Sequence, residues 1–100
     1  MAYEAGALDA MLAAAAGDDR KLFAELRAAF TESLGRQIDL LRRSRCDANW
    51  HVAAMRLKGL AASFNAEPLM TLAEEAIDAA PGEPSVVRKL QLFLNEFTAA

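Results

Sequence analysis

The stretch from Asn49 to Phe64, NWHVAAMRLKGLAASF, decides the fold because its apolar residues recur at helical spacing. At about 100° per residue, the residues on the core-facing arc are Trp50, Ala53, Ala54, Leu57, Leu60, Ala61 and Phe64. A second stripe, roughly 90° to 150° from the centre of that arc, holds His51, Met55, Lys58 and Ala62, and Gly59 lies opposite the core. The spacing predicts a helix over about residues 48–64, in which Trp50, Leu57, Leu60 and Phe64 are buried and Met55 is exposed.

Glycine and proline divide the remaining sequence into further helical segments. Apolar spacing predicts helices over about residues 19–44, 67–80 and 84–98, preceded by a short alanine-rich helix over about 7–15. The apolar stripe of the last helix is expected to contain Val87, Leu90, Phe93, Leu94 and Phe97. Short connections between amphipathic helices favour antiparallel neighbours. We therefore expect an all-α domain, an up-down antiparallel four-helix bundle with a short extra N-terminal helix.

Polar residues at the expected helix ends predict how the helices begin and stop. Asp18 and Asp19 precede the 19–44 helix, and Asp47 precedes the 48–64 helix. Each is predicted to cap its helix, because a carboxylate accepts hydrogen bonds from the free N–H groups of the first turn. Asn65 is predicted to end the 48–64 helix in the left-handed conformation, which asparagine tolerates better than most residues.

A basic cluster of Arg42, Arg43 and Arg45 lies where the 19–44 helix is expected to end. One interpretation is that the cluster complements the negative end of the helix dipole. The other is that it forms a patch for binding a partner. The sequence leaves both open.

Composition bounds the class of protein. The chain has 100 residues, 54% of them hydrophobic, and this favours a single domain over residues 1–100 with a sufficient core. The net charge of −3 argues against nucleic acid or a membrane surface as a partner. No apolar run reaches the roughly 18 residues of a membrane span, and one histidine with one cysteine, Cys46, does not make a typical zinc site. We expect a monomeric cytoplasmic protein without cofactor or metal.

The segment Ala54-Met55-Arg56-Leu57-Lys58-Gly59, followed by Asn65-Ala66, resembles the signature of histidine-containing phosphotransfer (HPt) domains. In that signature, Ala-His-x-Leu-Lys-Gly is followed a few residues later by a Gly-Ala pair. The resemblance covers roughly residues 17–98 when the four-helix pattern is included. This chain departs from the signature at Met55, which replaces the histidine, and at Asn65, which replaces the glycine.

The resemblance implies a partner and a site. The partner is the receiver domain of a response regulator, a histidine kinase, or both, within a two-component phosphorelay. The binding surface comprises His51, Met55, Lys58, Gly59 and Ala62. No catalytic residue is expected, because the methionine thioether has no titratable nitrogen and cannot form a phosphoramidate. The resemblance therefore predicts a protein that binds phosphorelay partners without transferring phosphate.

Two alternatives remain open from the residues. His51, the only histidine, lies on the same face and would be the acceptor of an active phosphotransferase. It stands one turn, about 5 to 6 Å, before the expected position, and phosphoryl transfer depends on accurate placement. The other alternative is a helical bundle that shares the fold and has no phosphorelay partner.

Overall fold

Five α-helices form the described part of the chain, which in the computed structural model comprises the backbone of residues 2–99 and the side chains of residues 8–99. Their bounds are Ala2–Ala16 for α1, Arg20–Arg43 for α2, Asp47–Ser63 for α3, Glu67–Asp78 for α4 and Pro84–Ala99 for α5. No strand occurs within residues 2–99. The all-α prediction is confirmed. None of these helices is both long enough and apolar enough to cross a bilayer.

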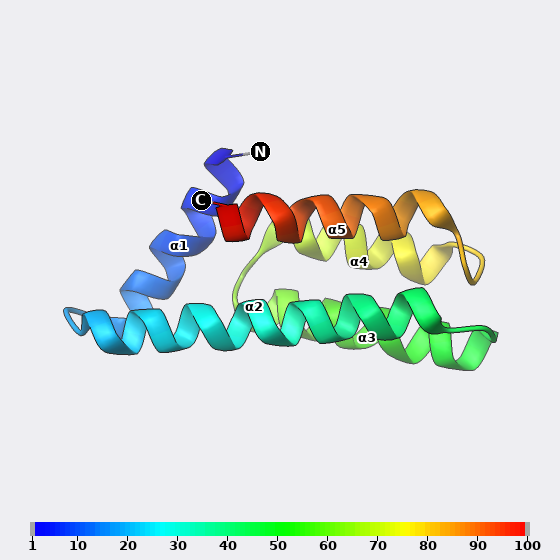
Figure 1. Ribbon diagram of the computed structural model, residues 1–100, viewed down its shortest axis with the longest axis horizontal. Coiled ribbons are helices and arrows are strands. Elements are labelled where there is room, and N and C mark those ends of the chain that lie inside the picture. Colours follow the sequence, from blue (N-terminus) through cyan, green and yellow to red (C-terminus); the bar gives the residue numbers. More distant parts are fainter. Residues whose placement is uncertain (1, 100) are drawn as a thin grey trace.

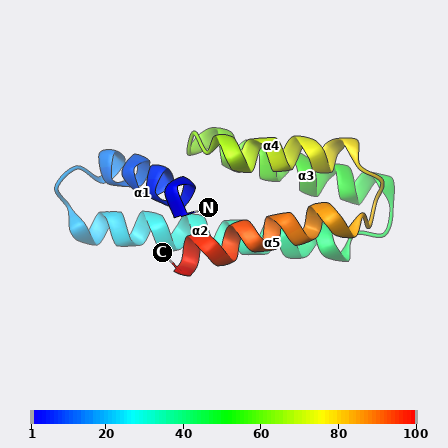
Figure 2. The ribbon, with the colours of Figure 1, turned by 90° about the horizontal axis from the view of Figure 1, so that it is seen from above.

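Among the last four helices, α2 packs against α3 and α5, α3 packs against α4, and α4 packs against α5. Successive helices from α2 to α5 reverse direction, and the views in Figure 1 and Figure 2 agree on this arrangement. The first helix, α1, packs on α2 and α5 and crosses obliquely beside the C-terminal end of α5 (Figure 1). The bundle is elongated, with extents of 44 × 22 × 18 Å.

The core lies between the helices and combines large side chains from α2 and α5 with alanines from α3 and α4. The fully or almost fully buried residues of the four-helix core are Phe30, Leu34, Ile38, Leu41, Trp50, Ala53, Ala54, Leu57, Ala61, Leu69, Ala73, Ala76, Val86, Leu90, Phe93 and Phe97. The Phe30 ring meets the rings of Phe64 and Phe97 edge-on, at centroid distances of 4.8 and 5.4 Å. Such pairs add stability beyond the area they bury.

Trp50 connects α3 to α4 by a buried hydrogen bond. Its indole Nε1 donates to the carbonyl oxygen of Ala76 at 2.7 Å. A tryptophan N–H inside a core needs such an acceptor, because an unpaired buried donor is costly. This contact and the buried residues of α3 together set the rotation of that helix, and with it the direction in which its outer face points.

The α1 helix is held by apolar residues and by one arginine. Leu8 and Leu12 are buried. The Arg27 guanidinium, from α2, donates its Nε–H to Asp9 of α1 at 2.8 Å and also donates to the carbonyl oxygen of Phe97 in α5. Its carbon lies 4.3 Å from the centroid of the Phe97 ring. One half-buried side chain thus joins three helices.

The helix ends follow the predicted chemistry with two exceptions. Asp19 caps α2 by accepting a hydrogen bond from Leu22 N at 3.0 Å, and Asn65 has a left-handed φ of 52°, as predicted. Asp18 lies in the preceding turn and is not the cap. The prediction that Asp47 caps α3 is wrong: Cys46 is the N-cap, without a side-chain hydrogen bond, and Asp47 is the first helical residue. Asp47 still places a negative charge in the first turn of α3, at the positive end of the helix dipole.

Several predicted bounds and faces differ from the structure. The α1 helix begins at Ala2 instead of about residue 7. The α4 helix stops at Asp78, because Ala79 is extended and Pro81 disfavours a helical residue before it. In α5 the buried valine is Val86, while Val87 is only half-buried. Among the residues predicted as buried in α3, Leu60 and Phe64 pack against the edge of the core and stay partly exposed.

Candidate functional site

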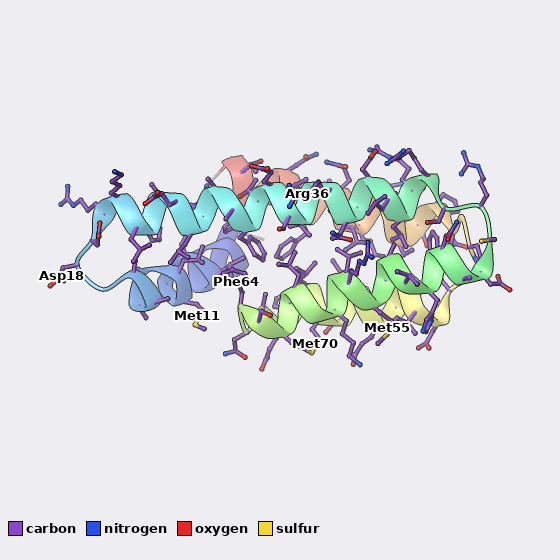
Figure 3. The ribbon with its side chains drawn as sticks, turned by 90° about the horizontal axis from the view of Figure 1, so that it is seen from below. Met11, Asp18, Arg36, Met55, Phe64 and Met70 are labelled. Atoms are coloured by element: carbon purple, nitrogen blue, oxygen red, sulfur yellow. The ribbon has the colours of Figure 1, made fainter. Side chains whose placement is uncertain are left out.

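The outward face of α3 carries all five residues predicted as the binding surface. Met55 is 45% exposed, and His51, Gly59 and Ala62 are also exposed. Figure 3 shows Met55 on the outside of the bundle, whereas Phe64, at the end of the same helix, turns inward. The predicted exposure of Met55 is confirmed. We call this set of residues (His51, Met55, Lys58, Gly59 and Ala62) the α3 face.

The position of Met55 is a consequence of how tightly the opposite side of α3 is packed. Ala54 and Leu57, which flank Met55 on the core side, have no exposed surface. A methionine side chain is flexible and often fills gaps in a core. Here the alanine-rich contact between α3 and α4 leaves no such gap, so the thioether faces solvent.

Lys58 lies at the border between α3 and α4, where its ammonium is 3.6 Å from a carboxylate oxygen of Glu74. The two side chains are 40% and 54% exposed, so this ion pair contributes at most about 1 kcal/mol. A carboxylate or phosphoryl group of a partner can therefore replace Glu74 at little cost. The sequence analysis did not predict Glu74 as the partner of Lys58, because no spacing within one helix reports which residues of the next helix lie beside it.

The neighbouring acidic residue, Glu75, points elsewhere. Its carboxylate accepts two hydrogen bonds from the ammonium of Lys89 in α5, at 3.0 and 3.2 Å. Adjacent residues on a helix diverge by about 100°, so Glu74 turns to α3 and Glu75 to α5. The two carboxylates do not form an acid–base pair.

Gly59 lies in the middle of the α3 face and is not required by the packing of this chain. A Cβ atom at Gly59 would meet nothing within 4 Å, and its φ is not in the left-handed region. Glycine in a helix interior costs about 1 kcal/mol relative to alanine. Nothing in the described part of the molecule offsets that cost.

His51 lies one turn before Met55, beside a different part of the molecule. It borders an open hollow of about 520 Å³ between the start of α3 and the end of α4, together with Trp50, Ile77 and Pro81. Met55 follows His51 by four positions in α3, which corresponds to about 6 Å along the helix axis. The histidine is thus exposed on the predicted face, one turn before position 55, where the resemblance expects the acceptor.

Neither a metal site nor a disulfide is present among residues 8–99. No group of three His, Cys, Asp or Glu side chains there lies close enough to hold a metal ion. Cys46 is exposed and unpaired with another cysteine. Comparisons of the chain with protein-family models, with curated proteins and with solved structures find no match.

Proposed function

We propose that this chain is an HPt-like interaction module of a two-component phosphorelay, a cytoplasmic up-down four-helix bundle that binds a receiver domain through the α3 face and transfers no phosphate. The observation that carries the proposal is that Met55 is exposed on the outward face of α3, with Lys58 and Gly59 three and four residues after it. A histidine kinase that carries such a receiver is a partner of the same kind.

The absence of phosphotransfer follows from the chemistry of Met55. Accepting a phosphoryl group from an aspartyl phosphate requires a nucleophile that ends as a stable phosphorylated group. An imidazole nitrogen loses a proton and forms a phosphoramidate, whereas a thioether sulfur has no proton to lose. The Met55 side chain instead offers a flexible apolar contact that adapts to a partner surface.

The α3 face suits close approach by another protein. Gly59 and Ala62 present almost no side-chain bulk, and both are exposed. Lys58 supplies a cation at the border with α4, held only by the exposed pair with Glu74. A small transient interface of this kind lies at the low end of the usual size range, with a dissociation constant on the order of micromolar.

Two other functions compete with this proposal. His51 is exposed and so accessible to a phosphorylated receiver, and its use as acceptor would make the chain an active phosphotransferase. A bundle without any phosphorelay partner is the third possibility. Stable, acid-labile phosphate on His51 would identify the second, and failure of every receiver to bind would favour the third.

The test is a titration by calorimetry of purified receiver domains from the source organism into the wild type and Gly59→Gln. We expect one receiver to bind the wild type and to lose binding to Gly59→Gln, because the glutamine occupies the open space above the helix. Ala28→Gln, at an exposed position of α2, is the matched control and should bind normally. Equal affinity of the wild type and Gly59→Gln would show that the α3 face is not the docking surface.

A further inference from the structure

A second surface lies in the seam between α2 and α3, toward the turn that joins them. Here the two helices leave an open groove of about 420 Å³. Its apolar lining includes Leu40 of α2 and Val52 and Ala53 of α3. Leu40 is 36% exposed and Val52 47% exposed, so two large apolar side chains of the lining face solvent.

The buried polar residue of the groove, Ser44, already has hydrogen-bond partners. Ser44, which is buried, donates its hydroxyl to the carbonyl oxygen of Leu40 at 2.7 Å and its backbone N–H to Leu41 at 3.1 Å. At Ser44 a ligand in the groove therefore meets a residue whose hydroxyl and backbone N–H already donate hydrogen bonds, so burying it under an apolar side chain leaves no donor unpaired.

Two arginines, one from each helix, line the groove. Arg43 comes from the last turn of α2, and Arg56 comes from the middle of α3. Arg43 shares the carboxylate of Asp39 with Arg42, at 3.0 and 2.9 Å. Among residues 8–99 no carboxylate lies within ion-pair distance of Arg56.

The helix dipole explains only part of this basic cluster. Arg42, Arg43 and Arg45 lie at the C-terminal end of α2, and Arg45 donates to the carbonyl oxygen of Arg42 at 3.3 Å. Those contacts complement the end of the helix. Arg56 lies far from any helix terminus, so the dipole gives no reason for its charge.

We propose that this groove binds an acidic segment of a partner protein, with a bulky apolar side chain seated between Leu40 and Val52 and carboxylates paired with Arg43 and Arg56. Charge complementarity selects this occupant, because the guanidinium group binds a carboxylate through two parallel hydrogen bonds. The lining of the groove includes no residue of the α3 face, and the proposal holds whether or not a receiver domain binds there.

Other anionic occupants fit the groove less well. A nucleic acid or an anionic membrane needs a broad basic surface, whereas the chain has a net charge of −3 and carries Asp39 and Asp47 close to the arginines in sequence. A short acidic segment with an apolar anchor uses both the apolar lining and the arginines.

The test is selection of a phage-displayed library of random 16-residue peptides on the immobilised wild-type protein. We expect enrichment of peptides in which Asp or Glu flanks a Leu, Phe, Ile or Met. Synthetic versions of these peptides should bind Arg56→Glu at least about tenfold more weakly than the wild type, since reversing one charge turns an attraction into a repulsion. Val52→Glu should weaken binding in the same way.

Two controls separate the groove from general electrostatics and from the α3 face. Arg88→Glu makes the same charge change at an exposed position on α5, outside the lining of the groove, and should leave peptide affinity unchanged. Ala62→Gln, at an exposed position of the α3 face six residues from Arg56, should also leave it unchanged while weakening receiver binding. Far-ultraviolet circular dichroism of each variant checks that the helices remain.

Several results would overturn the proposal. These are absence of enrichment, enrichment of peptides without acidic residues, and equal binding of the selected peptides to wild type and Arg56→Glu. Binding of phosphatidylserine vesicles or single-stranded DNA that depends on Arg56 would assign the groove to another class of partner. A dimer in sedimentation analysis that Arg56→Glu dissociates would assign it to a second copy of this chain.

Discussion

Replacing Gly59 by alanine should make the protein more stable and a poorer binding partner. The added methyl group meets no atom within 4 Å, so the substitution creates no clash. Alanine is favoured over glycine by about 1 kcal/mol in a helix interior, partly because glycine is more flexible in the unfolded chain. For a domain of this size, that gain raises the melting temperature by about 4 to 8 °C.

Gly35, in the middle of α2, provides the matched control. A Cβ atom there would lie 3.9 Å from Leu94 Cδ2, an ordinary van der Waals contact, so Gly35→Ala should stabilise the fold by a similar amount. Gly35 is not part of the α3 face. Only Gly59→Ala should therefore weaken receiver binding, and by less than Gly59→Gln.

The assay combines thermal and urea unfolding, followed by circular dichroism, with calorimetric titration of the receiver domain. Stabilisation by both alanines with loss of affinity at position 59 alone would assign the glycine to a partner. A destabilised Gly59→Ala would mean that the space around it is occupied. Equal affinities of the two variants would mean that Gly59 has no role in docking, and the main support for the proposed function would disappear.

Three further predictions concern the core, the chemistry and the pH dependence. Leu57→Ala should lower the free energy of unfolding by roughly 2 to 5 kcal/mol because Leu57 is fully buried, whereas Met55→Ala should cost under about 0.5 kcal/mol; similar costs in urea unfolding would refute the assigned rotation of α3. A radiolabelled phospho-receiver should leave the wild type unlabelled and should label Met55→His, in which the nitrogen nucleophile returns in register with Lys58; a label on the wild type that His51→Ala removes would show that the chain is an active transferase. The backbone N–H of Ser85 holds the pKa of the Glu83 carboxyl below its usual range. The stabilisation of the fold by the charged carboxylate is therefore present above the ordinary value of about 4.5 and is lost as the pH falls through the lowered pKa. Glu83→Gln should lower the melting temperature at neutral pH and have no effect at about pH 2; a constant difference across this range would contradict the role of the charge.

The sequence by itself determined the features that depend on neighbours within a turn or two. The spacing of apolar residues indicated the helices and placed Met55 on the outside of α3, because burial of one helical face follows from its periodicity. Asp19 and Asn65 were predictable as a cap and a left-handed residue, since each acts on adjacent backbone. The bounds were predicted less well: α4 ends at Asp78, two residues before the predicted end, because Ala79 is extended.

Only the tertiary structure decided which residues of different helices meet. The pairing of Lys58 with Glu74, the bridge that Arg27 makes between α1 and α5, and the convergence of Arg43 and Arg56 on one groove join residues from separate elements. The rotation of each helix about its own axis sets these contacts, and that rotation results from packing all the apolar faces together. The periodicity of one helix does not specify how that helix is rotated against its neighbours. For this reason the α3 face was predictable from the sequence and the groove beside it was not.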